Sequence, residues 1–234
     1  MQSNLQKMNE FFSRSAALLG AEVMEALQSV RVILFGIGGV GSWCAEALIR
    51  TGLTHLTIVD GDTVQPSNLN RQLPATQATL GQPKVFALRE RLLAINPDAE
   101  ITAIPEMVND EWLKANGLEG YNYVIDAIDS VNDKVDLIIY ASRVRGCKVF
   151  SSMGAALRFD PTQVTTGELF SIKGDALAKA VRARMKRLDL KPYKKIRCVY
   201  SLEQAQRCET RGSLMQVTAV FGLTLASMVI EDIR

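Results

Sequence analysis

Four closely spaced glycines have the arrangement of a phosphate-binding loop. They follow an apolar run at residues 31–35 and precede a helical pattern at residues 42–51, and they are Gly36, Gly38, Gly39 and Gly41. Glycines permit a tight turn and let backbone N–H groups approach phosphate oxygens at the positive end of a helix. The sequence therefore predicts a nucleotide-phosphate loop, with a simple strand–helix turn as the alternative.

A carboxylate at the end of the next apolar run extends this prediction to a ribose. Asp60 lies 19 positions after Gly41, close to the spacing of an acid that accepts hydrogen bonds from a ribose hydroxyl. The alternative for Asp60 is a turn or helix cap. Asp62 either helps to position the ribose or only shapes the turn.

Cations beyond these acids distinguish one nucleotide chemistry from another. Arg71 and Lys84 are donors of the kind that stabilise charge on phosphoryl oxygens and on a pyrophosphate leaving group. Such charge develops when a carboxylate attacks the α-phosphate of ATP, whereas hydride transfer needs no cations there. Asn68 and Gln72, beside Arg71, hold the loop or contact phosphate. The sequence thus favours adenylation over hydride transfer, and a solvated charged loop is the alternative.

Two further acids are candidates to hold the magnesium ion that accompanies ATP. The stretch VIDAID places Asp126 and Asp129 near the end of a strand, and carboxylate oxygens are suitable ligands for Mg²⁺. Asp129 is our prediction for the metal ligand, and Asp126 is left open. The alternative role for Asp129, capping a helix at residue 131, is one that Ser130 can fill.

Alternating strand and helix patterns must position these residues. Strands are predicted at residues 31–35, 55–60, 99–105, 121–129 and 147–153, and helices at 42–51, 83–95 and 131–145. This order predicts a Rossmann-like α/β fold, a doubly wound, mainly parallel sheet with helices on both faces. Since ligands bind at the carboxyl ends of such strands, Gly36, Asp60 and Asp129 are expected to converge.

The segments on either side of this core are expected to be less regular. Residues 11–29 form an amphipathic helix or a helix pair broken near Gly20. After Gly154 the patterns predict two short antiparallel strands around Asp160 and Pro161. A basic helix at 175–188, a strand at 195–201 and a helix at 214–232 follow. We expect one domain over residues 1–234, with a helical segment at 11–29, a nucleotide-binding core at 30–153 and an extension at 154–234.

Charge is spread unevenly along the 234 residues, although the net charge is only +2. Residues 170–211 hold 12 Lys and Arg against 4 Asp and Glu, a net of +8, and the rest holds 15 against 21, a net of −6. The four cysteines form no CxxC pair, so neither a zinc knuckle nor a redox pair is predicted. No signal peptide is predicted, and free thiols suit a cytoplasmic location.

The closing helix is apolar enough to raise the question of a membrane. Residues 212–230 carry no formal charge but include Gln216, Thr218 and two glycines. The stretch is borderline in length for a membrane span. We favour a buried or interface helix and expect no membrane contact.

In combination, four segments resemble the superfamily of ubiquitin-activating-enzyme-like adenylating proteins, to which ThiF, MoeB and HesA belong. The segments are GIGGVGS (36–42), DGDTVQPSNLNRQ (60–72), GQPK (81–84) and DAIDS (126–130). Bacterial members activate the C-termini of the ThiS and MoaD sulfur carriers. Other segments resemble one branch, the tRNA threonylcarbamoyladenosine dehydratases. These are FSRSAALLG (12–20), SSMGAALRFDPTQ (151–163), GDALAKAVRARMKR (174–187) and CVYSLE (198–203).

This resemblance implies roles for individual residues. Arg14 matches the arginine that homodimers of the superfamily donate to the ATP of the neighbouring subunit. Arg71 and Lys84 match phosphate-contacting residues, Asp60 matches the ribose acid and Asp129 matches the magnesium-associated acid. The resemblance therefore implies a homodimer that uses ATP and Mg²⁺, with the extension at 154–234 serving substrate binding and dimer formation.

The dehydratase branch also implies a substrate and a reaction. Its members adenylate the threonyl carboxylate of N6-threonylcarbamoyladenosine in tRNA and close it into a cyclic form, with loss of water. The basic segment is then expected to bind tRNA phosphates, with a solvated helix face as the alternative. The residues expected to do so are Arg182, Arg184, Lys186, Arg187, Lys194 and Lys195.

Two other functions stay open. One is an adenylyltransferase for a ThiS- or MoaD-like sulfur carrier, although the zinc cysteines of many such enzymes are absent from the sequence. The other is a nucleotide-binding scaffold with a degenerate site, against which the retained cations argue. Cys198 is a candidate for thioester chemistry, and a buried apolar cysteine is the favoured interpretation. A sulfurtransferase system as a further partner is also left open.

Overall fold

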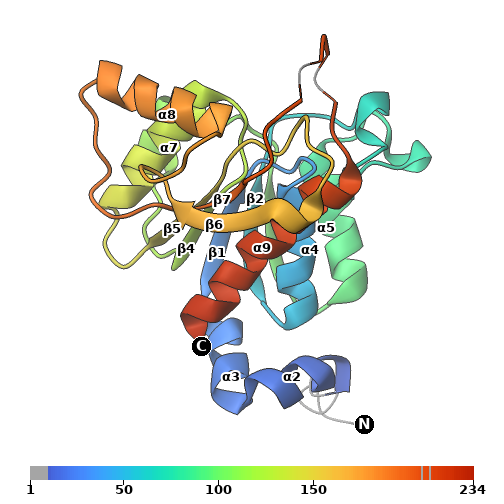
Figure 1. Cartoon of the computed structure of the whole chain (residues 1–234). Coiled ribbons are helices and arrows are strands. Elements are labelled where there is room, and N and C mark those ends of the chain that lie inside the picture. The colour runs from blue at the N-terminus through green and yellow to red at the C-terminus, as the bar shows by residue number, and fades with distance from the viewer. Residues whose placement is uncertain (1–9, 207, 211) are drawn as a thin grey trace.

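A seven-stranded sheet runs through the centre of the computed structural model (Figure 1). The structure describes residues 10–206, 208–210 and 212–234. The strand order is β3-β2-β1-β4-β5-β7-β6, and only β6 and β7 pair antiparallel among these described strands. The strands are β1 (Arg31–Phe35), β2 (His55–Val59), β3 (Glu100–Ile104), β4 (Tyr123–Asp126), β5 (Lys148–Ser152), β6 (Val164–Glu168) and β7 (Arg197–Ser201).

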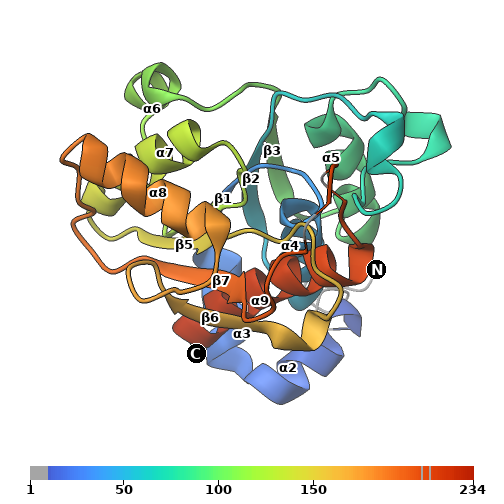
Figure 2. The ribbon, with the colours of Figure 1, turned by 45° about the horizontal axis from the view of Figure 1, so that its top comes forward.

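Helices cover both faces of the sheet (Figure 2). One face carries α4 (Gly41–Thr51), α5 (Lys84–Ile95) and α9 (Met215–Ile233), and the other carries α6 (Asp110–Asn116), α7 (Val131–Arg143) and α8 (Ala176–Arg187). The short helices α2 (Ser13–Leu19) and α3 (Ala21–Ser29) meet at Gly20, as the sequence predicts for a helix pair. The predicted Rossmann-like, doubly wound α/β fold is confirmed.

Strand register brings the carboxyl ends of the central strands to one edge. Phe35 at the end of β1 pairs with Val59 of β2 and with Asp126 of β4. The chain leaves β1 toward α4 on one face and leaves β4 toward α7 on the other. The point between β1 and β4 is therefore a topological switch point, and ligands of this fold class bind at the strand ends beside such a point.

Helices α4 and α9 pack closely against each other beside the predicted phosphate loop. Leu48 and Ile49 of α4 are fully buried there. A Cβ placed on Gly222 of α9 would lie 2.3 Å from the carbonyl oxygen of Val40, so only glycine allows this approach. The C-terminal helix is therefore built into the core beside the start of α4.

Within the described residues, α9 is also the helix that is long and apolar enough to cross a membrane by length and composition. Half of its 18-residue apolar window is buried within the protein. Val217, Phe221 and Leu225 on this helix are fully buried. The packing of α9 thus agrees with the prediction of a buried or interface helix.

Of the two short strands predicted around Asp160 and Pro161, the second is present as β6, and the prediction of a strand before Asp160 is wrong. Asp160 accepts hydrogen bonds from Thr162 N–H (2.9 Å) and Oγ1 (2.6 Å), and Pro161 opens the 3-10 turn η3 (Pro161–Gln163). A side chain that bonds its own backbone two residues on favours a turn over a strand. The antiparallel partner of β6 is β7, and their paired residues lie between 29 (Glu168 and Arg197) and 37 (Val164 and Ser201) positions apart in sequence.

Candidate functional site

The glycine loop follows β1 at this edge of the sheet and packs against the loop that follows β4. Gly36 has φ +88°, and a Cβ there would lie 2.7 Å from the carbonyl oxygen of Ala127. A Cβ on Gly41 would lie 1.8 Å from the oxygen of Gly36, so glycine is needed for the chain to enter α4. The Ser42 hydroxyl donates to the oxygen of Gly38 (2.7 Å) and tightens the turn. The loop thus has the tight geometry that phosphate binding requires.

Asp60 is held beside this loop by two backbone donors. Its carboxylate accepts hydrogen bonds from the N–H of Ile37 (2.6 Å) and of Asp62 (2.8 Å). Burial raises the pKa of Asp60, while the charge of nearby Lys84 opposes that shift. A carboxylate has lone pairs for more than two donors. Asp60 is therefore fixed in place and keeps acceptor capacity for a ribose hydroxyl.

Lys84 is buried at the start of α5 and its ammonium group reaches back toward Asp60 and Asp62. Only 7% of its side chain is exposed, and Nζ donates to Oδ2 of Asp62 at 2.6 Å. The backbone N–H of Lys84 also donates to the carbonyl oxygen of Asp62 (3.0 Å). Half of the Asp62 side chain is exposed. An ammonium group has three donors, and in the described part of the chain only one has a partner.

The side chain of Arg71 packs against the glycine loop at Gly39. Its Cγ would lie 3.1 Å from a Cβ on Gly39, and Trp43 Nε1 donates to its carbonyl oxygen (3.1 Å). One guanidinium nitrogen, Nη1, donates to Ser67 O (2.9 Å) and to Asn70 Oδ1 (2.8 Å). The cation is thus anchored through one nitrogen beside the phosphate loop.

The two amides predicted near Arg71 behave differently. Asn68 is buried and its Oδ1 accepts from the N–H of Gln65 (3.0 Å), so it holds the 3-10 turn η1 (Pro66–Asn68). Gln72 is 8% exposed and its Nε2 lies close to Gly38, but its Oε1 has no partner in the described residues. An unpaired buried acceptor is costly. Gln72 is therefore the better candidate of the two for contact with a bound molecule.

The two acids after β4 also separate. Asp126 ends the strand and is fully buried, with hydrogen bonds from Lys134 Nζ (2.7 Å), Ser151 Oγ (2.5 Å) and Ile128 N–H (3.1 Å). The strand stops there, three residues short of the predicted end at Asp129. Asp129 is exposed and has no hydrogen-bond or ion-pair partner among the residues described. Of the two, only Asp129 is free to contact a metal ion.

Helix capping does not account for Asp129. The residue at the N-cap of α7 is Ser130, and its side chain makes no capping hydrogen bond. Neither Asp129 nor Ser130 therefore caps α7 through its side chain. The packing of Gly36 on Ala127 places the Asp129 loop next to the glycine loop.

Arg14 is not brought to this site within one subunit. It is exposed on α2, next to Phe12, which contacts the region of Gly52 at the C-terminal end of α4. The glycine loop lies at the other end of α4, about 16 Å away for 11 residues. Figure 1 shows α2 below the sheet, away from the strand ends that carry the glycine loop.

The six predicted tRNA-binding cations do not form one free surface. Arg182 Nη1 donates to Leu169 O (2.8 Å), and Lys194 Nζ donates to Val144 O (2.7 Å) and to Cys147 O. Arg184 is half-buried, whereas three are exposed, namely Lys186, Arg187 and Lys195. The alternative of a wholly solvated face does not describe this segment, because Arg182 and Lys194 bind backbone carbonyl groups of neighbouring connections.

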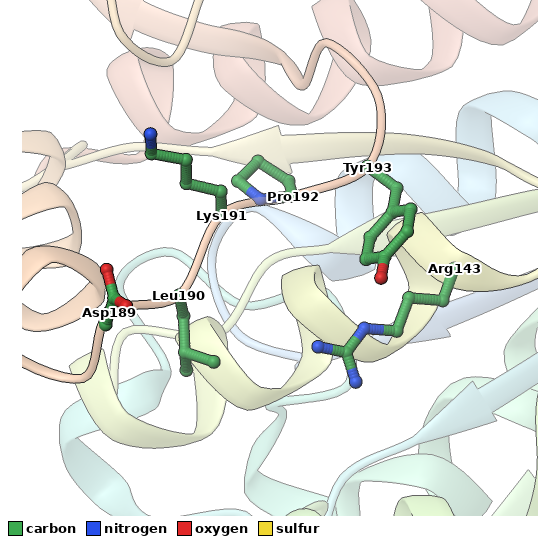
Figure 3. A pocket seen from close by; sticks show the side chains of 6 residues that line it. All are labelled: Arg143, Asp189, Leu190, Lys191, Pro192 and Tyr193. Carbon is green, nitrogen blue, oxygen red and sulfur yellow. The ribbon is translucent and has the colours of Figure 1, made fainter.

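A hollow of about 400 Å³ lies beside this basic segment (Figure 3). Its lining residues come from the end of α7 and from the loop between α8 and β7, and they are Arg143, Asp189, Leu190, Lys191, Pro192 and Tyr193. The guanidinium of Arg143 lies 5.5 Å from the ring centre of Tyr193, whose side chain is largely exposed. Aromatic rings beside cations are typical of surfaces that bind single-stranded nucleic acid.

Cys198 lies on β7 and is fully buried. Burial raises the pKa of its thiol, which keeps it protonated and unreactive at neutral pH. Cys208 is the exposed cysteine among the four. The favoured interpretation of Cys198 as a buried apolar residue agrees with this environment.

Buried charges that position the site escaped prediction. Lys134 on α7 binds Asp126, and Arg158 binds Asp175 Oδ2 (3.0 Å) while Asp175 also caps α8 through Ala178 N–H (2.8 Å). Both ion pairs are almost completely buried. A lysine within the otherwise apolar face of a helix was the available signal for Lys134, but nothing near Arg158 in sequence indicates its partner.

A glycine loop, a carboxylate fixed beside it and two anchored cations at a switch point are features of a nucleotide-binding α/β protein. The chain belongs to the ThiF family, whose model matches residues 12–233.

Individual relatives narrow the comparison. The chain is 37% identical over 192 residues to a tRNA threonylcarbamoyladenosine dehydratase of Bacillus subtilis, covering 82% of this chain and 74% of the relative. It is similar to the crystal structure of the Escherichia coli enzyme of that name, TcdA, in complex with ATP. That match has a TM-score of 0.91 at 33% identity and covers 100% of this chain and 96% of the other. A molybdopterin-synthase adenylyltransferase of Salmonella typhimurium is 37% identical, over 59% of this chain and 54% of its own.

Proposed function

We propose that this chain is an ATP-dependent dehydratase that cyclises N6-threonylcarbamoyladenosine in tRNA by adenylating its carboxylate. The observation that carries the proposal is the pair Arg71 and Lys84, two fixed cations with donors left over among the described residues. Arg71 lies beside Gly39 of the glycine loop, and Lys84 lies near Asp60. Donors fixed before the reaction stabilise charge that develops on phosphoryl oxygens. The dehydratase relatives, which match along most of this chain, supply the identity of the acid.

The proposed reaction has two steps. A carboxylate oxygen of the substrate attacks the α-phosphorus of ATP, and the bond to the β-phosphate oxygen breaks to release pyrophosphate. A nitrogen or oxygen of the threonylcarbamoyl group then attacks the activated carbonyl carbon, loses its proton, and expels AMP. The carboxylate oxygen leaves within AMP, so the nucleoside has lost one water in total. Lys84 and Arg71 serve the first step by holding the phosphates.

Asp129 is the residue we propose for Mg²⁺. No group of three or more His, Cys, Asp or Glu able to hold a metal occurs among the described residues. Mg²⁺ at nucleotide sites keeps several waters and is bound through one or two carboxylates plus substrate phosphates. One free carboxylate beside the phosphate loop fits that requirement. When bound, the ion would neutralise phosphate charge.

Arg14 is proposed to act in a homodimer, on the nucleotide of the partner subunit. Its place on α2, away from the glycine loop of its own chain, supports a contribution between subunits. Exposed apolar side chains on the same segment, Phe11 and Leu18, support a covered surface there. Mixing Arg14→Ala with Lys84→Ala subunits tests this, because a mixed dimer would contain one complete site. If the mixture recovers no activity after subunit exchange, the assignment is wrong.

The tRNA surface is proposed to follow α8 from the nucleotide edge. Asp175 caps α8 and contacts Gly154 N–H (3.2 Å) just beyond the end of β5, and the helix then runs about 18 Å for 12 residues. Its far end carries the exposed Lys186 and Arg187. Lys195 and the hollow at Tyr193 follow (Figure 3). Arg182 and Lys194 then hold this surface in place rather than provide free charge, because backbone carbonyl groups bind them.

The remaining proposals concern the whole protein. We propose that residues 1–234 act as one adenylating domain in the cytoplasm, with the parts at 11–29, 30–153 and 154–234 assigned as above. A sulfur-carrier adenylyltransferase is the second candidate. It is the weaker one because the adenylyltransferase relative matches little more than half of this chain, whereas the dehydratase structure matches all of it.

One experiment separates these functions. The protein is incubated with ATP, Mg²⁺ and tRNA bearing threonylcarbamoyladenosine, and the digested nucleosides are weighed by mass spectrometry. We expect a nucleoside lighter by one water, formed only with ATP. An unchanged nucleoside, together with pyrophosphate exchange that appears only with a ThiS- or MoaD-like protein, would support the second candidate instead.

A further inference from the structure

Asn70 joins the ATP-side arginine to the far end of the chain. Its Oδ1 accepts from Arg71 Nη1 (2.8 Å), and its Nδ2 donates to the carbonyl oxygen of Ser213 (2.9 Å). Reversing this amide would place a donor against a donor and an acceptor against an acceptor. The two contacts therefore fix both the place and the orientation of the side chain.

The anchoring of Arg71 leaves one side of its guanidinium open. Ser67 O and Asn70 Oδ1 both take their hydrogen bonds from Nη1. In the described part of the chain, Nε and Nη2 have no such partner. These two nitrogens form a fork that suits two oxygens of a phosphate. Holding Nη1 therefore turns the free fork in a defined direction.

The start of α9 completes this arrangement from the C-terminal extension. Ser213 lies just before α9, and Thr218 on its first turns would lie 3.1 Å from a Cβ on Gly39, at the same place as Arg71 Cγ. The glycine loop, the Arg71 stem and α9 thus pack at one point. Gly222 lets α9 approach α4 closely enough for these contacts.

We propose that Asn70 is a positioning residue that aims Arg71 at the nucleotide phosphates and takes its own position from the segment preceding α9. Through this contact the C-terminal extension contributes to the ATP site as well as to the surface for tRNA. The inference rests on the proposed function only in taking ATP as the nucleotide. A purely structural role, tying the loop at residues 60–83 to α9, is the competing explanation.

A double-mutant cycle separates the two explanations. ATP dissociation constants are measured by calorimetry for the wild type, Asn70→Ala, Arg71→Ala and the double variant. With Arg71 present, Asn70→Ala should weaken binding about fivefold, as expected for coupling between residues in contact. In the Arg71→Ala background the same change should have almost no effect. A similar loss in both backgrounds would overturn the proposal.

Two controls sharpen this cycle. The Asn70→Ala effect should persist in a Lys84→Ala background, because Lys84 is held by Asp62 and not by Asn70. Asn116→Ala loses one comparable bond, from Nδ2 to Trp112 O (2.9 Å), away from the site, and should leave ATP affinity unchanged. A fall in melting temperature without a change in ATP affinity for Asn70→Ala would also refute positioning.

The outcome is distinguishable from failure of the proposed function. The same wild-type preparation is assayed for loss of water from threonylcarbamoyladenosine in tRNA. If ATP binds and the cycle behaves as expected while the nucleoside stays unchanged, Asn70 positions Arg71 in an enzyme with another acid substrate. A wild type that does not bind ATP would refute both proposals.

Discussion

Two lysine–aspartate ion pairs lie near the carboxyl ends of the central strands, and their surroundings differ. Lys134 and Asp126 are both fully buried, and Lys134 Nζ also contacts Ser151 Oγ (3.4 Å) and Ser152 O (2.9 Å). All three donors of that ammonium group are occupied. Lys84 pairs with the half-exposed Asp62 and has no other partner among the described residues. The first pair is closed to ligands, whereas the second keeps donors for one.

The difference teaches that burial of both partners, and not the presence of a pair, marks a structural role. Asp126 accepts a hydrogen bond from the N–H of Ile128, in the turn that carries Asp129. Lys134 stabilises that turn by binding Asp126. Lys84 lies near Asp60, whose carboxylate binds the N–H of Ile37 in the glycine loop. A change at one pair should therefore be seen in folding, and a change at the other in chemistry.

Breaking the closed pair should have the largest effect. Lys134→Met leaves Asp126 buried without its cation, which we expect to lower the free energy of unfolding by about 3–5 kcal/mol. Urea unfolding followed by circular dichroism measures this. Lys114→Met removes an exposed partner of Asp110 and should leave the unfolding midpoint nearly unchanged. Equal midpoints for the two variants would contradict the comparison.

Breaking the open pair should act on catalysis. Lys84→Met removes a donor that we propose stabilises developing charge, so the rate of pyrophosphate release with ATP and modified tRNA should fall roughly 10²- to 10³-fold. The free energy of unfolding should change little, because solvent can reach the remaining Asp62. A variant that unfolds easily yet keeps its rate per folded molecule would place Lys84 with the structural lysines.

The two acids after β4 extend the comparison to Mg²⁺. Asp129→Asn should raise the Mg²⁺ concentration needed for half-maximal pyrophosphate release by roughly tenfold, as loss of a metal-site contact commonly does. Its melting temperature should match that of the wild type. Asp126→Asn should do the opposite, melting earlier with an unchanged Mg²⁺ requirement. A wild-type Mg²⁺ requirement in Asp129→Asn would remove Asp129 from the metal site.

The smallest effect is expected at Cys198, which lies near the closed pair. Burial raises the pKa of its thiol, and only the thiolate is nucleophilic. Cys198→Ala should therefore keep most of the dehydration activity, and iodoacetamide should label Cys208 before Cys198 in the native protein. A variant that releases pyrophosphate normally but no longer forms the cyclic nucleoside would instead show that a thioester is involved.

Much of the fold was determined by local sequence. Apolar runs followed by glycine or aspartate predict β1, β2 and β4 and the edge at which their loops meet, since strand and helix periods are local properties. The basic helix at 175–188 was likewise predicted, and the helix pair at Gly20 was one of the two alternatives for residues 11–29. The glycine loop with Asp60, Arg71 and Lys84 was recognisable because glycine conformation and charge type do not depend on distant partners.

The tertiary structure decided which charged side chains are free. In sequence, Asp126 could not be separated from Mg²⁺ binding beside the predicted ligand Asp129, and six cations of the basic segment were equal candidates for tRNA. In the folded chain Lys134 donates a hydrogen bond to Asp126, and Arg182 and Lys194 donate hydrogen bonds to backbone carbonyl groups. The link from Asn70 to Ser213 spans 143 positions and has no local signature. Burial and pairing depend on elements far apart in the chain, so only folding reveals which groups remain available for a ligand.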